Sequence, residues 1–272
     1  MTVLAAQRQA LIVAALDRDG VVRVSDLAEE LGVSDMTVRR DLTTLQDEGM
    51  LVKVHGGARV MNQLSTAEPS FAVKSRRSLP QKEAIAAAAA DLVRPGDAIA
   101  ISAGTTTLAL ARHLTQVPYL TVVTNSVWVA NVLADDGHES TTVLLTGGQR
   151  TPSHALVGPL AVAALRSFHL DRCFLGVHGI HPEKGFTTPN LLEAETNRTM
   201  IAAAGGLVVV TDSSKWDVVG LSSMATLEQA ETVVTDSGLP GEAREVLEGA
   251  VGRLHVVETG THTVDDSAGA GG

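Results

Sequence analysis

The part of this 272-residue chain that most limits its fold is the segment from residue 81 to residue 258, where helical and β-prone runs alternate. Helical patterns over 82–93 and 194–204 are each followed by a short apolar run, at 98–101 and 207–210. Strands that alternate with helices in this way are typical of an α/β domain with a largely parallel sheet. We therefore expect one large α/β domain over residues 81–258.

The first 60 residues follow another pattern, with three helical segments and then two short strands. Apolar residues recur at helical spacing up to Gly20, and Ser25 is expected to be the N-cap of a second, shorter helix. Gly32-Val33-Ser34 separates that helix from a third, because glycine permits a left-handed turn and serine is a good N-cap. Two helices joined by a short turn with glycine form a helix-turn-helix.

The run over residues 51–60 follows this motif and reads as two short strands around Gly56-Gly57, which is the pattern of a wing. A helix-turn-helix places its second helix in the major groove of DNA. There an arginine can form two hydrogen bonds with guanine, and a threonine can contact a thymine methyl group. The residues expected to contact DNA are Ser34, Thr37, Arg39, Arg40, Lys53, His55 and Arg59.

Overall charge does not favour a nucleic-acid partner. The formal net charge is −10, and residues 1–59 carry seven basic and nine acidic side chains. The prediction of DNA binding therefore depends on where the basic residues lie on one face. The alternative is a three-helix module that binds another protein and exposes Arg39 and Arg40 to solvent.

Val38-Arg39-Arg40-Asp41-Leu42, continued by Leu45, Gly49 and His55-Gly56-Gly57-Ala58, closely resembles the N-terminal domain of the DeoR family of sugar-metabolism repressors. The resemblance covers nearly all of residues 6–60. It implies that the chain is a transcription regulator, that double-stranded operator DNA is its partner, and that it represses its target genes.

Polar loops follow several predicted strands of the α/β domain. Gly104 to Thr107 places a glycine and three hydroxyl groups where a helix begins, and free backbone N–H groups at such a site favour a phosphate. Ligands of such sheets bind beyond the carboxyl ends of the strands. The candidate effector-binding residues in these loops are Gly104, Thr105, Thr106, Thr107, Asn125, Ser126, Gly147, Gly148 and Lys215.

These loops, together with Phe174-Leu175-Gly176, also resemble the effector domain of the DeoR family, whose fold is similar to ribose-5-phosphate isomerase. The resemblance runs from about residue 68 to residue 236. It implies that residues 104–107 hold the phosphate of a sugar phosphate, with Asn125 and Lys215 in contact with it. Family members often carry Asp where this chain has Ser102.

The segment Thr187-Thr188-Pro189-Asn190, followed by Glu193 and by Asn197-Arg198, is similar to the branch of the family that responds to amino sugars. This likeness implies a hexosamine or N-acetylhexosamine phosphate as effector. Arg198 either faces that ligand or covers the surface of its helix.

The main alternative is an enzyme, a sugar-phosphate isomerase with an added DNA-binding domain. Isomerisation requires a positioned base, but the loop at 178–181 and its surroundings lack an acidic cluster. We therefore expect no catalytic residue and no enzyme activity. His178, His181 and His169 have no cysteine or closely spaced aspartate beside them, so neither a metal site nor a cofactor is expected.

The remaining features indicate where the domains begin and end, in which compartment the protein acts, and how it assembles. Residues 61–80 read as a linker between the DNA-binding domain, 1–60, and the effector domain, 81–258, while residues 259–272 read as a disordered tail. No apolar run reaches the ~20 residues of a membrane helix, and the single cysteine suits a reducing, cytoplasmic compartment. Since palindromic operators mirror two-fold protein symmetry, we expect a homo-oligomer.

Overall fold

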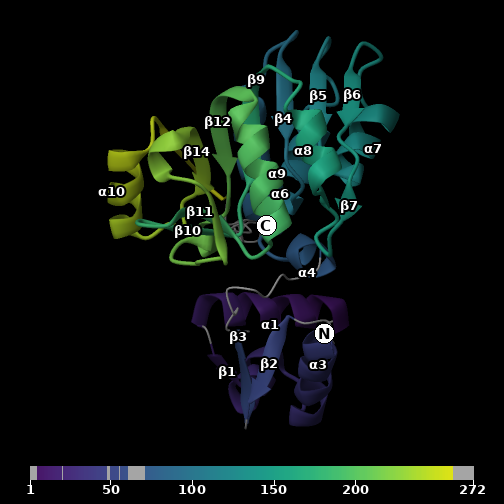
Figure 1. Cartoon of the computed structure of the whole chain (residues 1–272). Coiled ribbons are helices and arrows are strands. Elements are labelled where there is room, and N and C mark those ends of the chain that lie inside the picture. The colour runs from purple at the N-terminus through teal and green to yellow at the C-terminus, as the bar shows by residue number, and fades with distance from the viewer. Residues whose placement is uncertain (1–4, 20, 48–49, 55, 61–70, 260–272) are drawn as a thin grey trace, which may run out of the picture.

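The computed structural model describes residues 5–19, 21–47, 50–54, 56–60 and 71–259, and it shows a small N-terminal part below a larger α/β part (Figure 1). The N-terminal part contains α1 (Ala5–Asp19), β1 (Val21–Arg23), α2 (Val24–Leu31), α3 (Asp35–Asp47), β2 (Leu51–Val54) and β3 (Gly57–Val60).

Three helices and a small antiparallel sheet of order β1-β3-β2 make up this part, as the sequence predicted for a winged helix-turn-helix. The prediction that Ser25 is an N-cap was wrong. Helix α2 begins at Val24, whose N–H donates to the Gly56 carbonyl (2.9 Å), so the pairing of β1 with the hairpin sets the start of the helix. Ser25 lies inside the helix and donates to Asp26.

The N-terminal part has a hydrophobic cluster of its own, to which all three helices and the sheet contribute. Ile12 and Leu16 come from α1, Leu27 from α2, and Leu42 and Leu45 from α3. All five side chains are at most 3% exposed. Burial of each such side chain stabilises the folded state by about 1.5–3 kcal/mol, so this cluster contributes much of the folding free energy of the N-terminal part.

The larger part begins after a short helix, α4 (Phe71–Arg76), that lies between the two parts (Figure 1). Its elements are α5 (Leu79–Ala90), β4 (Ala98–Ile101), α6 (Thr105–His113), β5 (Thr121–Thr124), α7 (Val127–Asp135), β6 (Thr142–Leu145), β7 (Gln149–Arg150), β8 (Leu156–Val157), α8 (Pro159–Leu165), β9 (Leu170–Gly176), β10 (Gly179–His181), β11 (Gly185–Thr188), α9 (Leu191–Ala202), β12 (Ala204–Val210), η1 (Ser213–Lys215), β13 (Ser222–Ala225), η2 (Leu227–Gln229), β14 (Ala230–Asp236), α10 (Gly241–Ala250) and β15 (Leu254–Val257).

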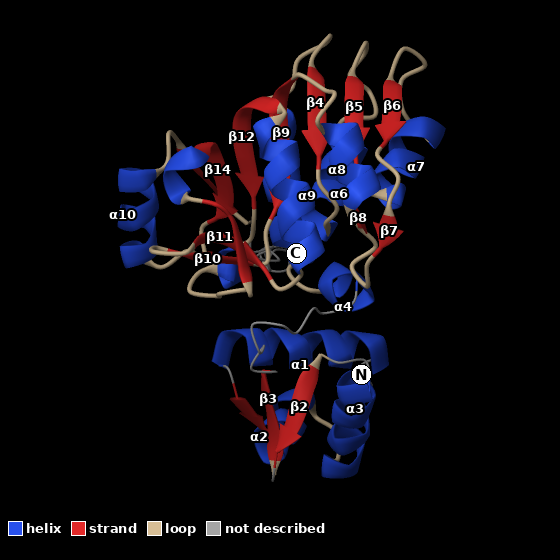
Figure 2. Ribbon diagram, viewed as in Figure 1, coloured by secondary structure: helices blue, strands red, loops and turns tan. Residues whose placement is uncertain are grey.

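Seven strands form one parallel sheet of order β15-β14-β12-β9-β4-β5-β6, with helices on both faces (Figure 2). Consecutive strand residues point to opposite faces. In β9, Phe174 joins the cluster under α5, α6 and α7, while Cys173 and Leu175 join the cluster under α8, α9 and α10. The predicted α/β class and parallel sheet are therefore confirmed. Cys173 is fully buried, and burial raises the pKa of its thiol to about 12.

Two local expectations require correction. The loop expected over residues 104–107 is largely the first turn of α6, which begins at Thr105, since the N–H of Leu108 already donates to the Gly104 carbonyl at 3.0 Å. The loop expected over 178–181 is largely β10, which pairs with β11 in an antiparallel hairpin. Residues 260–272 of the tail that was expected to be disordered, and the first half of the expected linker, 61–70, lie outside the described residues.

Candidate functional site

The turn between α2 and α3 has the geometry that the sequence predicted. Gly32 has a φ of 64°, in the left-handed region, and its N–H closes the end of α2 on the carbonyls of Ala28 and Glu29. The hydroxyl of Ser34 accepts from the N–H of Thr37 at 3.3 Å and lies 3.0 Å from the Thr37 hydroxyl. Ser34 therefore caps the N-terminus of α3 and stabilises the start of this helix.

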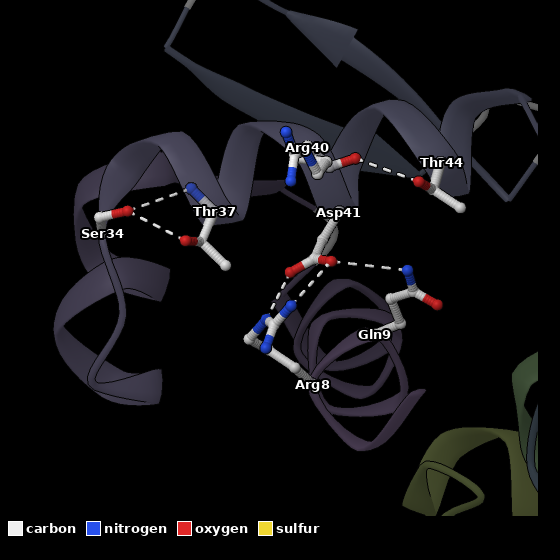
Figure 3. Close-up of polar contacts among 7 residues, drawn as sticks. All are labelled: Arg8, Gln9, Ser34, Thr37, Arg40, Asp41 and Thr44. Atoms are coloured by element: carbon white, nitrogen blue, oxygen red, sulfur yellow. Dashed lines mark hydrogen bonds and ion pairs between the residues drawn. The ribbon is translucent and has the colours of Figure 1, made fainter. Parts of the chain in front are cut away.

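A buried ion pair fixes the position of α3 against α1. The guanidinium of Arg8 donates to both carboxylate oxygens of Asp41, from Nε at 2.5 Å and from Nη2 at 3.1 Å, and Gln9 approaches the same carboxylate (Figure 3). Asp41 is only 3% exposed, and this carboxylate raises the pKa of Arg8. The pair holds α3 against α1, because a two-point contact fixes orientation as well as distance.

The opposite face of α3 is open. Arg39 and Arg40 are both exposed, and Met36, in the first turn, is 75% exposed. The Thr43 and Thr44 hydroxyls donate to the carbonyls of Arg39 and Arg40, at 2.8 and 3.2 Å. The threonines thus bond within the helix, while the two guanidinium groups and the Met36 side chain remain available to a partner.

Lys53 of β2 lies beside this face. Its ammonium donates to the hydroxyl of Thr43 at 2.8 Å, and its backbone N–H donates to Gln46 at 3.1 Å. The structure therefore brings the cation of Lys53 next to α3. His55 and the side chain of Arg59 lie outside what the structure describes.

A pocket opens at the carboxyl ends of β4, β9 and β12, in the place where α/β sheets bind their ligands. Its walls come from the loop after β4, the loops after β9 and β12, helix α9 and the linker helix α4. The residues that line it are Phe71, Lys74, Arg77, Lys82, Ala103, Gly104, Thr105, Thr106, Ser153, Gly176, Val177, His178, Thr188, Glu193, Asn197, Val210, Thr211, Asp212, Lys215 and Met224.

The loop after β4 presents Gly104, Thr105 and Thr106 to this pocket. Thr107, also predicted to bind, is fully buried and donates its hydroxyl hydrogen bond to the Gly104 carbonyl at 3.1 Å. Ser102 is buried too, and its hydroxyl accepts from the N–H of Gly176 at 3.0 Å. Ser102 therefore links the end of β4 to β9 beneath the loop.

Four other predicted residues do not line the pocket. Asn125 is 1% exposed, because its amide supports the neighbouring loops: Oδ1 accepts from Ala103 N–H at 2.8 Å, and Nδ2 donates to the Leu156 carbonyl at 3.2 Å. Ser126 caps α7 by accepting from Val129 N–H. Gly147 and Gly148 have φ values of 71° and 120° and make the turn into β7. All four residues therefore support loops and helix ends, and none of them lines the pocket in which a ligand contact was predicted.

Cations are concentrated at the pocket, with Lys74, Arg77, Lys82 and Lys215 all in its wall. Asp212 lies among them. Burial by itself raises the pKa of this carboxyl group, but Lys215, the Ser214 hydroxyl and Lys82 outweigh burial and hold the pKa below its ordinary value. Asp212 is therefore charged at neutral pH, and it balances part of the positive charge of the pocket wall.

Helix α9 contributes the other polar wall. The carboxylate of Glu193 accepts hydrogen bonds from the hydroxyls of Thr151 (2.9 Å), Ser153 and Thr188 (3.3 Å). Asn197, one turn later, is 7% exposed; its Nδ2 lies 3.1 Å from the sulfur of Met224, and its Oδ1 has no hydrogen-bond partner among the described residues. A buried amide oxygen without a partner is uncommon, which makes Asn197 a candidate hydrogen-bond acceptor in the pocket wall.

Arg198 does not reach the pocket. It donates to the Ser223 carbonyl at 2.6 Å, which decides between the two alternatives in favour of the helix surface.

Among the described residues there is no cluster of three His, Cys, Asp or Glu side chains that could bind a metal. Nor does any described helix combine the length and the apolar character needed to span a membrane.

The sequence interpretation missed Lys82 and Asp41. Lys82 shares one helix face with Ile85, Ala86 and Ala89, and Asp41 shares one with Val38 and Leu45; all of these are buried. A charged residue on the apolar stripe of a helix was thus the available indication, since charges are almost never fully buried unless they are paired.

An exposed recognition helix beside a wing, joined to an α/β domain with a cationic pocket, defines a ligand-responsive DNA-binding regulator. Family models agree: residues 8–64 match the DeoR-like helix-turn-helix domain, and residues 77–237 match the DeoR C terminal sensor domain. The chain belongs to the DeoR family of transcription regulators. We call residues 79–257 the sensor domain from here on.

Similar proteins are regulators as well. The chain is 35% identical to a "Putative aga operon transcriptional repressor" of Escherichia coli O157:H7, over 89% of this chain and 90% of that one. It is 34% identical to a "Lactose phosphotransferase system repressor" of Streptococcus mutans, over 81% and 88%. Among solved structures, ribose 5-phosphate isomerase A from Methanocaldococcus jannaschii matches 50% of this chain and 53% of that one, with 15% identity and a TM-score of 0.36.

Proposed function

We propose that this regulator represses genes of sugar metabolism and that a phosphorylated sugar controls it by binding the pocket of the sensor domain. The observation that supports this most strongly is the pocket itself, where the N-terminus of α6 lies among Lys74, Arg77, Lys82 and Lys215. Two relatives named as repressors of the aga operon and of a lactose phosphotransferase system support the same function.

The phosphate is proposed to bind at Gly104, Thr105 and Thr106. The first N–H groups of a helix have no partner within the helix, and the helix dipole adds a partial positive charge there. Hydrogen bonds to a charged phosphate are roughly twice as strong as bonds between neutral groups. A neutral sugar would leave these donors and the ammonium of Lys215 poorly matched, so the pocket selects phosphorylated ligands.

The sugar part is proposed to face α9. Glu193 offers a carboxylate and Asn197 an unmatched amide oxygen, both of which accept hydrogen bonds. An amino sugar carries a donor, and at neutral pH a cationic one, that suits two such acceptors. We therefore propose a hexosamine phosphate or a related amino-sugar phosphate as the effector, and release of DNA as its effect.

A ligand screen tests the phosphate site. Hexose and hexosamine phosphates are expected to raise the melting temperature of the purified protein, whereas each parent sugar is not, and the best phosphate is expected to release promoter DNA. Lys215→Ala and Thr105→Val should each weaken that binding, while Lys184→Ala, which removes a lysine exposed on the β10–β11 hairpin, should not. Equal responses to sugars and their phosphates would show that the site assignment is wrong.

The DNA-binding face is proposed to consist of Ser34, Thr37, Arg39, Arg40, Lys53, His55 and Arg59. A single winged helix on one half-site has limited affinity, so we also propose a homodimer or homotetramer that pairs two such faces. Exposed apolar side chains on the sensor domain, among them Leu144, Leu145, Leu160 and Leu191, provide surface for assembly. Light scattering at micromolar concentration should give the mass of two or four chains, and the mass of one chain would contradict this.

A further inference from the structure

One side chain connects the ligand pocket with the winged helix. Arg77 follows α4 and lines the pocket of the sensor domain. Its Nη2 donates to the carbonyl of Met50 at 2.6 Å. Met50 is 3% exposed, belongs to the core of the N-terminal part and directly precedes β2. A charged group of the pocket wall thus holds the backbone of the DNA-binding part.

The backbone at Arg77 is itself held by the sensor domain. The buried ammonium of Lys82 donates to the carbonyls of Lys74 and Arg77, at 2.5 Å each. At the start of α4, the ring of Phe71 stacks on those of Trp128 and His154, with centroids 6.1 and 5.3 Å apart. Both ends of α4 are thus held against the sensor domain, and the side chain of Arg77 reaches from there to the Met50 carbonyl.

The guanidinium of Arg77 has donors to spare. Its Nε is buried and has no hydrogen-bond partner within the described part of the chain. The bond to Met50 uses a neutral carbonyl, whereas a phosphate accepts two parallel, charge-assisted bonds from one guanidinium. An anion in the pocket would therefore compete well for this side chain.

We propose that Arg77 is a two-position switch that couples the pocket to the DNA-binding part. Without effector it holds the Met50 carbonyl; with effector it turns to the anion and releases the winged helix from this orientation. The proposal rests on the proposed function, because it requires an anionic ligand. A ligand shifts an equilibrium only through its different affinities for the two states, and an arginine bonded in only one of them provides that difference.

Hydrogen exchange with inorganic phosphate as the probe tests the switch in the full-length protein. In wild type, phosphate is expected to increase amide exchange over residues 50–54 on the order of 5-fold or more, relative to chloride at equal ionic strength. Arg77→Met should show the faster exchange without phosphate, and phosphate should add little. Arg77→Lys should lie between, since lysine keeps the charge but lacks the planar fork.

The control is Arg112→Met, which removes an exposed arginine of α6 and should behave like wild type. If phosphate raises the melting temperature but exchange over 50–54 is the same in wild type and in both Arg77 variants, the switch is overturned while the phosphate site stands. If phosphate does not bind wild type at all, the phosphate site and the switch are both overturned.

Discussion

Asp41→Ala is expected to destabilise the winged helix by about 3–5 kcal/mol, because it leaves the guanidinium of Arg8 buried without its carboxylate. Asp41 is 3% exposed and Arg8 is 8% exposed, so water can replace little of the lost interaction. Amide exchange in peptides of α1 and α3 during urea titration should show the loss, with no change in the parallel sheet of the sensor domain.

Two further variants separate the buried pair from the effect of substitution on a helix. Asp47→Ala removes an exposed carboxylate from the end of the same helix and should change stability little. Arg8→Met combined with Asp41→Leu removes both charges, and should recover much of the stability lost in Asp41→Ala. Equal unfolding of Asp41→Ala and Asp47→Ala would show that the pair has no net effect.

Replacing both Arg39 and Arg40 with Ala is expected to weaken binding to promoter DNA by about 2–6 kcal/mol, if each arginine contributes about 1–3 kcal/mol and the two act independently. Both side chains are exposed on α3 and neither belongs to a hydrophobic cluster. The melting temperature should therefore stay close to that of wild type. Fluorescence anisotropy with labelled promoter DNA measures the loss.

Arg23→Ala provides the matched control, because Arg23 is also exposed in the N-terminal part but lies on β1 and not on α3. It removes the same charge and should weaken binding far less. If the double variant binds promoter DNA as tightly as wild type, α3 does not read the operator, and the exposed arginines are only a solvated surface.

The features that depend on local pattern could be predicted from the sequence. Gly32 with Ser34 located the turn before α3, and the alternation of apolar runs with helices predicted the parallel sheet, since both follow from short-range periodicity. Boundaries were less accurate. The start of α2 is set by the bond from Val24 to Gly56, a contact between segments 32 residues apart that no local pattern contains.

The binding site was predicted less completely than the fold, for a similar reason. Residues 104–106 and Lys215 line the pocket, whereas the polar groups of Asn125 and Ser126 form hydrogen bonds within the neighbouring loops and helix. The pocket wall instead takes Lys82 from the middle of α5 and Arg77 from the linker. Sequence can indicate which groups suit a phosphate; only packing shows which of them are already used.

The position of Cys173 has a consequence for the kind of stimulus that this regulator can register. It is the one cysteine of the chain, fully buried in the central strand β9, with its thiol pKa raised to about 12. At pH 7 roughly one thiol in 10⁵ is then ionised, and oxidants react with the thiolate. Cys173 should therefore react slowly with peroxides and disulfides while the domain stays folded, so a thiol-based redox signal is not expected to act through this residue.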